Sequence, residues 1–365
     1  MSLDLPTELF WHVLTYLEDS DLFNLRSICK SIDSKCLDPF GRRCFRIRQF
    51  MLSAEGLQAL CTVANGRFGR FVRTLRIGSE ALACSRTEAG ERQGRFRDLY
   101  EGQVFFRLRG IDTALLSLAL RSLSGTLEEI VVAGNNTKNG HRSWGARRLE
   151  VETGTKLINE QTRTLSTTLA AIASSQIQLR VFRNEPMAGQ RGIGAHRDSI
   201  SMPYCETTML CNAFSALRVL QLSLWVPEIA IEPRLPSLTV CLVKLLSTMP
   251  NLEELHLGLQ RVLQAPELGE DIGSATFSTS LRIVHVVGGC MQESHVSLFL
   301  INHLRSLRTV VLEKLILEGG YEMLLARLGA NDCSSVGIGL SLTLKDVQDG
   351  VTGSMVSYSS QISEL

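Results

Sequence analysis

Two histidines and a glutamate are the residues of this chain best placed to act together chemically. His256 and His285 hold the fifth position of two similar six-residue segments, LEELHL and LRIVHV, and Glu254 stands two residues before the first histidine. If these segments are adjacent strands, the imidazoles lie one strand apart and the carboxylate can orient one of them. Three polar groups without a nucleophile or a metal do not make a catalytic site. We therefore expect polar side chains on an exposed strand face.

Other residue types that carry chemistry lack the spacing that it requires. The histidines are dispersed, and Cys29, Cys36, Cys44 and Cys61 do not form the close pairs of a zinc site. No serine stands in a G-x-S-x-G turn. The glycines between 189 and 194 could offer amides to a phosphate, but no Gly-Lys-Ser ending completes such a loop. We expect a protein that is not an enzyme and that uses no metal and no cofactor.

The composition is that of an ordinary globular protein. Of 365 residues, 44% are apolar and 21% are charged, and the net charge is +1. No run approaches the roughly 20 apolar residues of a membrane span, and the first residues lack the basic and apolar parts of a secretory signal. Ten cysteines are scattered in apolar runs, as expected of reduced thiols. We expect an intracellular protein, cytoplasmic or nuclear or both, with no membrane partner.

Residues 5 to 40 predict short helices with more apolar surface than they can cover. Pro6 suits a helix start because its missing N–H would be unpaired there in any case. The run from Glu18 to Asp21 ends the first helix and supplies an N-cap for a second. Apolar residues recur at helical spacing in both: Leu9, Phe10, Val13, Leu14 and Leu17, then Leu22, Leu25 and Ile28. A third short helix, at 31 to 37, leaves part of this surface for another chain.

The order of these residues resembles the F-box. The resemblance covers about residues 3 to 48 and rests on Leu-Pro-x-Glu-Leu at 5 to 9, Asp21-Leu22 and Leu25-Arg26-x-x-Cys29-Lys30. The family's helices dock on the adaptor Skp1, so the resemblance implies Skp1 contacts from Leu5, Pro6, Leu9, Val13, Leu22 and Leu25. The family commonly has tryptophans where Ser31-Ile32 and Pro39-Phe40 stand here. The alternative is a plain three-helix cap that turns Leu5, Pro6 and Leu9 inward.

Beyond these helices one six-residue pattern returns seven times: aliphatic, charged, any, apolar, any, then usually aliphatic. The segments begin at Val72, Leu127, Leu179, Leu217, Leu252, Leu281 and Leu307. Helical patterns lie between them, at 111–123, 159–173, 238–249 and 295–304, and a last strand is expected at 336–344. Long polar inserts also interrupt the array. Strands that alternate with helices predict an α/β fold, a solenoid with a parallel sheet.

The pattern resembles irregular leucine-rich repeats, which are often joined to F-boxes. We therefore expect an F-box at residues 1–48, a repeat-like solenoid at 49–344 and a tail at 345–365. In such a repeat, positions one, four and six turn inward, and positions three and five face the concave side of the sheet. The concave positions include Arg76, Val131 and Arg183 and, in the C-terminal half, Gln221, Glu254, His256, Ile283, His285 and Val311. Apolar residues there indicate either a partner site or a surface covered by inserts or by the tail.

The resemblance to F-box proteins implies a two-part adaptor. The helices would tie the chain to Skp1, and through it to a cullin, as the substrate-recognition subunit of a ubiquitin ligase. The C-terminal half of the concave face would hold the target protein. The alternative is an interaction scaffold that works outside a ligase. Eight arginines between Arg42 and Arg76 could meet phosphates, but acids elsewhere balance them, so nucleic acid is not the expected partner.

Overall fold

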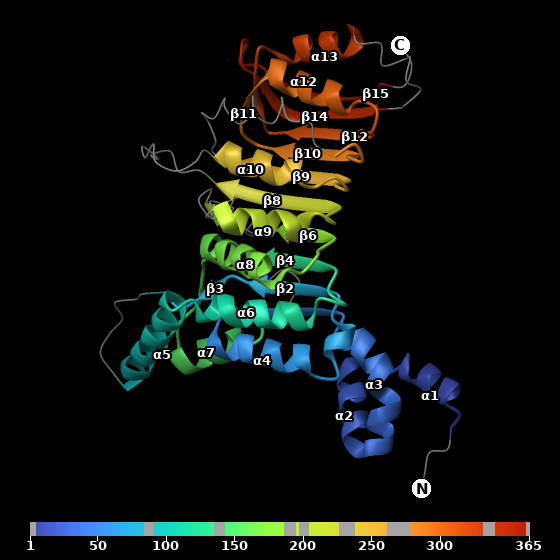
Figure 1. The fold of residues 1–365 in the computed structure, drawn as a ribbon, viewed down its shortest axis with the longest axis vertical. Coiled ribbons are helices and arrows are strands. Elements are labelled where there is room, and N and C mark those ends of the chain that lie inside the picture. The colour runs from blue at the N-terminus through green and yellow to red at the C-terminus, as the bar shows by residue number, and fades with distance from the viewer. Residues whose placement is uncertain are drawn as a thin grey trace.

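The computed structural model describes residues 5–83, 91–134, 143–185, 195–196, 204–225, 238–260, 278–330 and 340–362. A small helical unit precedes an elongated stack of strands and helices, and the two ends of the chain lie at opposite ends of the molecule (Figure 1). The predicted α/β class is confirmed. The phosphate-loop candidate at 189–194 lies outside the described residues.

The N-terminal unit consists of three helices, α1 (Thr7–Leu14), α2 (Asp19–Ile28) and α3 (Lys30–Cys44). The third helix is longer than predicted, and one extended residue, Cys29, separates it from α2. The unit has a core of its own, made by Phe10, Leu14, Leu22, Cys36 and Phe40. It is therefore a packed body and not an arm of the sheet.

The strands that follow form one main sheet in chain order. Its parallel part runs through β1 (Ile47–Met51), β2 (Thr74–Gly78), β4 (Glu129–Ala133), β6 (Val181–Asn184), β8 (Val219–Trp225), β9 (Glu254–Gln260), β10 (Ile283–Val287), β12 (Thr309–Glu313) and β14 (Leu340–Asp349). All seven six-residue segments are strands of this sheet and neighbours in sequence order. The predicted parallel sheet is confirmed.

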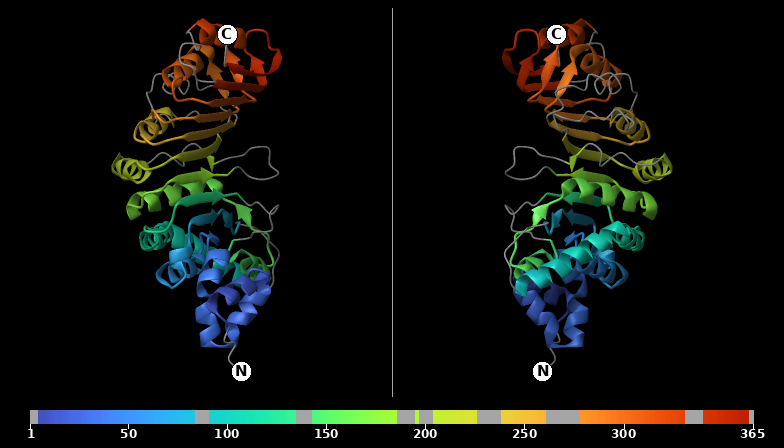
Figure 2. Two further views of the ribbon diagram at one scale, coloured as in Figure 1. Left: turned by 90° about the vertical axis from the view of Figure 1, so that its right-hand side faces the viewer. Right: turned by 90° about the vertical axis from the view of Figure 1, so that its left-hand side faces the viewer.

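Helices line one face of the sheet (Figure 2). They are α4 (Ala54–Asn65), α6 (Ile111–Ser122), α8 (Gln161–Ser175), α9 (Tyr204–Phe214), α10 (Leu238–Ser247), α12 (Glu293–His303) and α13 (Tyr321–Ala330). The four predicted helices agree with observed ones to within two residues at each end. Such helices link each pair of consecutive parallel strands except β9 and β10, whose connection lies mostly outside the described residues, so the chain advances by one strand each time it crosses the sheet.

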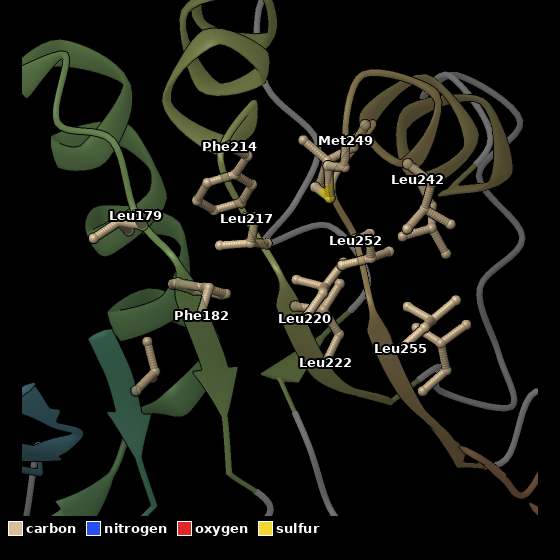
Figure 3. Close-up of a cluster of buried hydrophobic side chains, with 14 of the residues drawn as sticks. Leu179, Phe182, Phe214, Leu217, Leu220, Leu222, Leu242, Met249, Leu252 and Leu255 are labelled. Atoms are coloured by element: carbon tan, nitrogen blue, oxygen red, sulfur yellow. The ribbon is translucent and has the colours of Figure 1, made fainter. Parts of the chain in front are cut away.

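Leucines on the helix side of the sheet form the core of the stack (Figure 3). In β8 and β9 the residues at positions four and six, Leu220, Leu222, Leu255 and Leu257, are at most 2% exposed. Burying one such side chain contributes about 1.5–3 kcal/mol. Each strand therefore gains stability from packing against the helices, and each repeat shares its apolar contacts with its neighbours.

Asn184 is the residue that breaks the apolar sixth position, and it is nevertheless completely buried. Its Nδ2 donates to the backbone oxygen of Ser223 at 2.9 Å, and its Oδ1 accepts from Nε2 of Gln161 at 2.7 Å. A buried amide without such partners would be costly. The buried side-chain amide of Asn184 is therefore hydrogen-bonded to the next strand, β8, and to α8.

The remaining elements are short strands and helices between or beside the repeats. They are η1 (Gly69–Phe71), β3 (Glu80–Ala81), α5 (Glu91–Leu108), α7 (Ala146–Thr153), β5 (Ile158–Asn159), β7 (Ala195–His196), β11 (Cys290–Gln292), β13 (Ile316–Glu318) and β15 (Met355–Ile362). The helices α5 and α7 lie in segments expected as polar inserts. The segment expected as a C-terminal tail largely completes β14 and forms β15, which pairs antiparallel with β14.

Strand β1 was not predicted, because Arg and Gln interrupt its apolar pattern. It begins at Ile47, two residues inside the N-terminal region that was assigned to residues 1–48. Its outer edge is partly covered by Trp144, whose N–H donates to the oxygen of Gln49 at 3.0 Å. The sheet therefore starts on the first strand after the helices.

An ion-pair cluster and a close helix contact join the N-terminal unit to the sheet. Arg26 and Arg67 each lie 2.7 Å from a carboxylate oxygen of Asp33. Desolvation acts to raise the pKa of Asp33, but the hydrogen bonds and charges of the two arginines together hold that pKa below its usual value.

Gly41 lets α3 approach the stack, since a Cβ there would lie 2.2 Å from the ring of Phe71.

The strand register can be tested through stability. Replacing Leu255, which is 1% exposed, with alanine should lower the free energy of unfolding by about 3 kcal/mol through lost apolar contacts and a cavity. Gln221→Ala, on the opposite face of the neighbouring strand, should change it by less than about 0.5 kcal/mol. Urea unfolding followed by circular dichroism measures both. Equal effects of the two substitutions would contradict the register.

Candidate protein-binding surfaces

Helix α1 presents two apolar sides. Phe10 and Leu14 face the core of the N-terminal unit and are 4% and 2% exposed. Leu9 and Val13, one turn apart, face away from it and are 55% and 48% exposed. Leu5, just before the helix, is 37% exposed. The structure thus leaves an apolar strip on α1 that the chain's own core does not cover.

The predicted adaptor contacts divide according to this geometry. Leu5, Pro6, Leu9 and Val13 are exposed together along α1, and the alternative in which Leu5, Pro6 and Leu9 turn inward is wrong. Leu22 is a correction to the contact set. It is 1% exposed and belongs to the core of the unit, because its position on α2 faces α3 instead of solvent.

Four exposed residues enlarge the apolar surface beyond the predicted contacts. Tyr16 on the turn after α1, Phe23 and Ile28 on α2, and Trp11 on α1 are between 44% and 76% exposed. Leu25, which was predicted, is only half-buried and packs against the core. The width of the apolar stripe was the available signal for Trp11 and Tyr16. Spacing alone could not assign Phe23 to the core or to the surface. Its ring contacts Phe40 of the core, with 4.9 Å between centroids, and yet the side chain is exposed.

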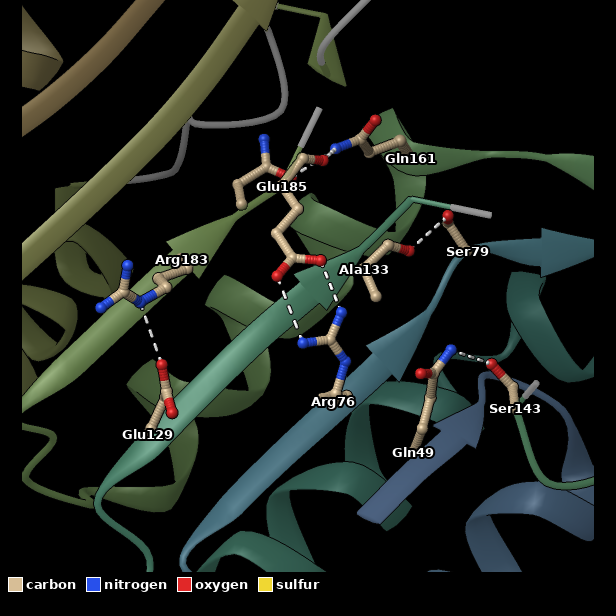
Figure 4. A network of polar contacts seen from close by, with 10 residues as sticks. Gln49, Arg76, Ser79, Glu129, Ala133, Ser143, Gln161, Arg183 and Glu185 are labelled. Carbon is tan, nitrogen blue, oxygen red and sulfur yellow. Dashed lines mark hydrogen bonds and ion pairs between the residues drawn. The ribbon is translucent and has the colours of Figure 1, made fainter. Parts of the chain in front are cut away.

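On the sheet face opposite the helices, which was predicted to be concave and keeps the name concave face here, the N-terminal half is occupied by ion pairs (Figure 4). Arg76 on β2 donates to both carboxylate oxygens of Glu185, at 3.2 and 2.5 Å. Arg183 on β6 donates to Glu129 at 3.0 Å. The first pair reaches across β4, so Val131 beneath it is 2% exposed and does not face solvent as predicted. The polar groups of this half satisfy one another.

The C-terminal half of the concave face brings the six predicted binding residues together. Gln221 is the register partner of His256, His256 of His285, and His285 of Val311. Glu254 is likewise the partner of Ile283. All six are half-buried, so their outer atoms form one continuous surface across four strands. The sequence located this group because strand register follows directly from the repeated pattern.

The two histidines contact each other but are weakly held. Their ring centroids lie 5.8 Å apart in an edge-to-face arrangement. His256 Nε2 and Glu254 share a long hydrogen bond of 3.5 Å, whereas His285 Nε2 lies 3.8 Å from Glu313, beyond hydrogen-bond distance. His285 Nε2 is buried and has no hydrogen-bond partner among the described residues. The accessible polar groups of this half are therefore those of His256 and Glu254, whose side chains are partly exposed, and not the buried Nε2 of His285.

Burial is the main cause that lowers the pKa of His285 below its usual value. The neighbouring His256 and Lys345 lower it further, while the carboxylate of Glu313 acts to raise it. His285 is therefore neutral at neutral pH. A neutral, half-buried imidazole between Ile283 and Val311 is compatible with an apolar or hydrogen-bonding contact from another protein.

The part of the chain that the structure describes contains no arrangement suited to a metal ion. No group of three or more His, Cys, Asp or Glu side chains within it is arranged to hold a metal ion. The thiol of Cys290 donates to Glu318, and burial followed by that hydrogen bond raises the pKa of this thiol to about 11. It is protonated at neutral pH and is a poor nucleophile. No helix in the described part of the chain is long and apolar enough to cross a membrane.

Comparison with known proteins bears on the N-terminal unit. Residues 2–46 match the family model of the F-box-like domain, which spans α1, α2 and α3. The chain is thus an F-box-like helical domain followed by a large parallel sheet with helices. Among curated proteins, no match to the sequence is found.

The electrostatics of His285 can be tested by NMR titration. The pKa of its imidazole should lie below the usual value of about 6.5, should rise in His256→Gln and should fall further in Glu313→Gln. Because the folded pKa is below the unfolded one, this residue should make the protein less stable as pH falls below about 6.5. A pKa above that value, or one that neither substitution moves, would contradict the described surroundings.

Proposed function

We propose that the protein is the substrate-recognition subunit of a Skp1–cullin–F-box ubiquitin ligase. In this proposal α1 and its neighbours bind Skp1, the strand–helix units are irregular leucine-rich repeats, and the C-terminal half of the concave face holds the target protein. The chain itself performs no chemistry and works in the cytoplasm, the nucleus or both. The exposed apolar strip on α1 within an F-box-like domain is the observation that carries the proposal.

The strip supports helix docking for an energetic reason. Leu5, Leu9 and Val13 are exposed in a unit whose core is already filled by Phe10 and Leu14. Contiguous exposed apolar side chains on a soluble surface are typical of a site for another protein, and a helix with apolar residues four apart fits a groove on the partner.

The target site is proposed from the contrast between the two halves of the concave face. In the N-terminal half Arg76, Glu129, Arg183 and Glu185 are paired with one another. In the C-terminal half the histidines lack good hydrogen bonds, and apolar Ile283 and Val311 flank them. The C-terminal strand β15 pairs with the edge of β14. This arrangement favours a partner site over the alternative in which the tail folds across these residues.

The first test is binding of purified Skp1 to the full-length chain. The triple substitution Leu5→Ala, Leu9→Ala and Val13→Ala should weaken binding by at least about 30-fold, since the loss of a single apolar anchor already costs about 2 kcal/mol. Its circular dichroism should be unchanged because all three residues are exposed. Isothermal titration calorimetry measures the affinity.

A matched control removes the same kind of surface elsewhere. Phe105, Leu108 and Val151 on α5 and α7 are 57%, 82% and 76% exposed, and their replacement by alanine should leave Skp1 affinity unchanged. Equal binding by the α1 variant and the wild type would refute docking through α1. Skp1 binding without co-purification of a cullin would favour the scaffold function over the ligase.

The second test concerns target capture. Acidic substitutions at His256 and His285, made together, should remove the target from the proteins that co-purify with the tagged chain, while Skp1 remains bound. Two added carboxylates at these half-buried positions beside Glu254 and Glu313 would repel one another and be costly to desolvate under an apolar partner. Gln58→Glu with Ser166→Glu, on exposed positions of the helix side, is the control. Capture that survives the histidine substitutions would place the target site elsewhere.

A further inference from the structure

A row of charged residues runs along the rim of the sheet where the parallel strands begin. The first is Arg46, just before β1. The other seven hold the second position of the repeated six-residue segments: Arg73, Glu128, Arg180, Arg218, Glu253, Arg282 and Arg308. The row is continuous. From Arg73 onward, the backbone N–H of each member donates to the backbone oxygen of the previous member of the row, at 2.8 to 3.1 Å. We call these eight residues the charged rim.

The charged rim forms one continuous surface feature. The strands begin on the right-hand side of Figure 1, which faces the viewer in the left-hand view of Figure 2. Neighbouring strands lie about 4.8 Å apart, so seven steps between eight residues span about 34 Å. An extended peptide rises about 3.4 Å per residue, so about 10 residues would match this length. The rim is therefore long enough to bind a segment of another chain.

The rim has a surplus of positive charge that its own acids do not neutralise. Six arginines stand against two glutamates, whereas the whole chain has a net charge of only +1. Glu128 lies 3.6 Å from Arg73, and Glu253 lies 3.6 Å from Arg218. Exposure to solvent explains why this position is charged. It does not explain why one sign dominates.

Four arginines of the rim, Arg46, Arg180, Arg282 and Arg308, have no ion-pair partner among the described residues, and all four side chains are exposed. Because each glutamate is shared with an adjacent arginine, these four carry the uncompensated charge. They occur at both ends and in the middle of the row. A partner would have to present acidic groups along the whole row to neutralise them.

At its N-terminal end the rim borders a cleft. This cleft has a volume of about 530 Å³ and is lined by Arg42, Arg46, Arg70 and Arg73 together with the acids Asp38 and Glu128. Arg70 pairs with Asp38 at 2.7 Å, and Arg42 lies 3.6 Å from the same carboxylate. Four arginines against two acids continue the positive surplus of the rim into the junction with α3.

We propose that the charged rim binds an acidic segment of a protein partner. The glutamate on every third residue of the row would repel an evenly charged phosphate backbone, and the rim has no aromatic side chain on which a base could stack. A polypeptide can bend its acidic side chains toward the arginines and away from the glutamates. The rim is distinct from both the α1 strip and the concave residues, so this proposal does not depend on Skp1 binding.

The test is fluorescence anisotropy with the full-length chain and a labelled peptide of about 10 residues made of Glu-Glu-Ser repeats, which is long enough to follow the rim. The triple substitution Arg180→Gln, Arg282→Gln and Arg308→Gln should weaken binding about tenfold, since exposed charge contacts each contribute modestly. The corresponding Arg→Lys triple variant should retain most of the affinity. Glu128→Gln with Glu253→Gln should bind the peptide several-fold more tightly.

The control removes the same charge from another surface. Arg97, Arg109 and Arg147 are exposed on or beside α5 and α7, and their replacement by Gln should leave peptide affinity unchanged. Equal loss in this control, or no measurable peptide binding at low salt, would overturn the proposal. A labelled oligothymidylate that binds more tightly than the peptide, and loses affinity in the rim variant, would overturn it in favour of nucleic acid. Skp1 binding should be the same in all these variants.

Discussion

The burial of one leucine ladder between the parallel sheet and its helices is the constraint on which the structure depends. Strand residues alternate between the two faces, so fixing positions four and six against the helices fixes positions three and five on the opposite face. A shift of one residue would expose Leu255 and Leu257 and bury His256. The surface chemistry of the concave face is thus set by apolar packing on the opposite, helix-covered face of the sheet.

The same alternation explains why different parts of the surface could be predicted to different degrees. The strands, the helix side and the grouping of Gln221, His256 and His285 follow from a local pattern repeated in sequence. The cover over Val131 does not, because it depends on an ion pair between Arg76 and Glu185, 109 residues apart. The strand β1 and the pairing of β15 with β14 also depend on neighbours supplied by distant segments, so their own sequences were insufficient.

In the N-terminal helices, periodicity identified the apolar residues but could not divide them between core and surface. Phe10 and Leu9 are adjacent in sequence and are both apolar, yet only Phe10 is buried. The division is made by α3, whose Cys36 and Phe40 complete the core with Leu14 and Leu22. Once α3 takes up that side, the other side of α1 has nothing in the described structure to cover it. Helical spacing alone could not show that Leu22 faces this core, so the sequence placed it wrongly among the partner contacts.

The arrangement places three surfaces of different chemistry on one scaffold. The α1 strip is apolar, the C-terminal half of the concave face mixes imidazoles with aliphatic side chains, and the charged rim is polar throughout. Each depends on a different part of the fold: helix packing, strand alternation and the backbone hydrogen bonds at the strand starts. Leu9 lies on α1, His285 on β10 and Arg180 just before β6, so substitutions on the three surfaces are made on separate elements. The separate binding of an adaptor and a target, as proposed, is therefore physically compatible with this fold.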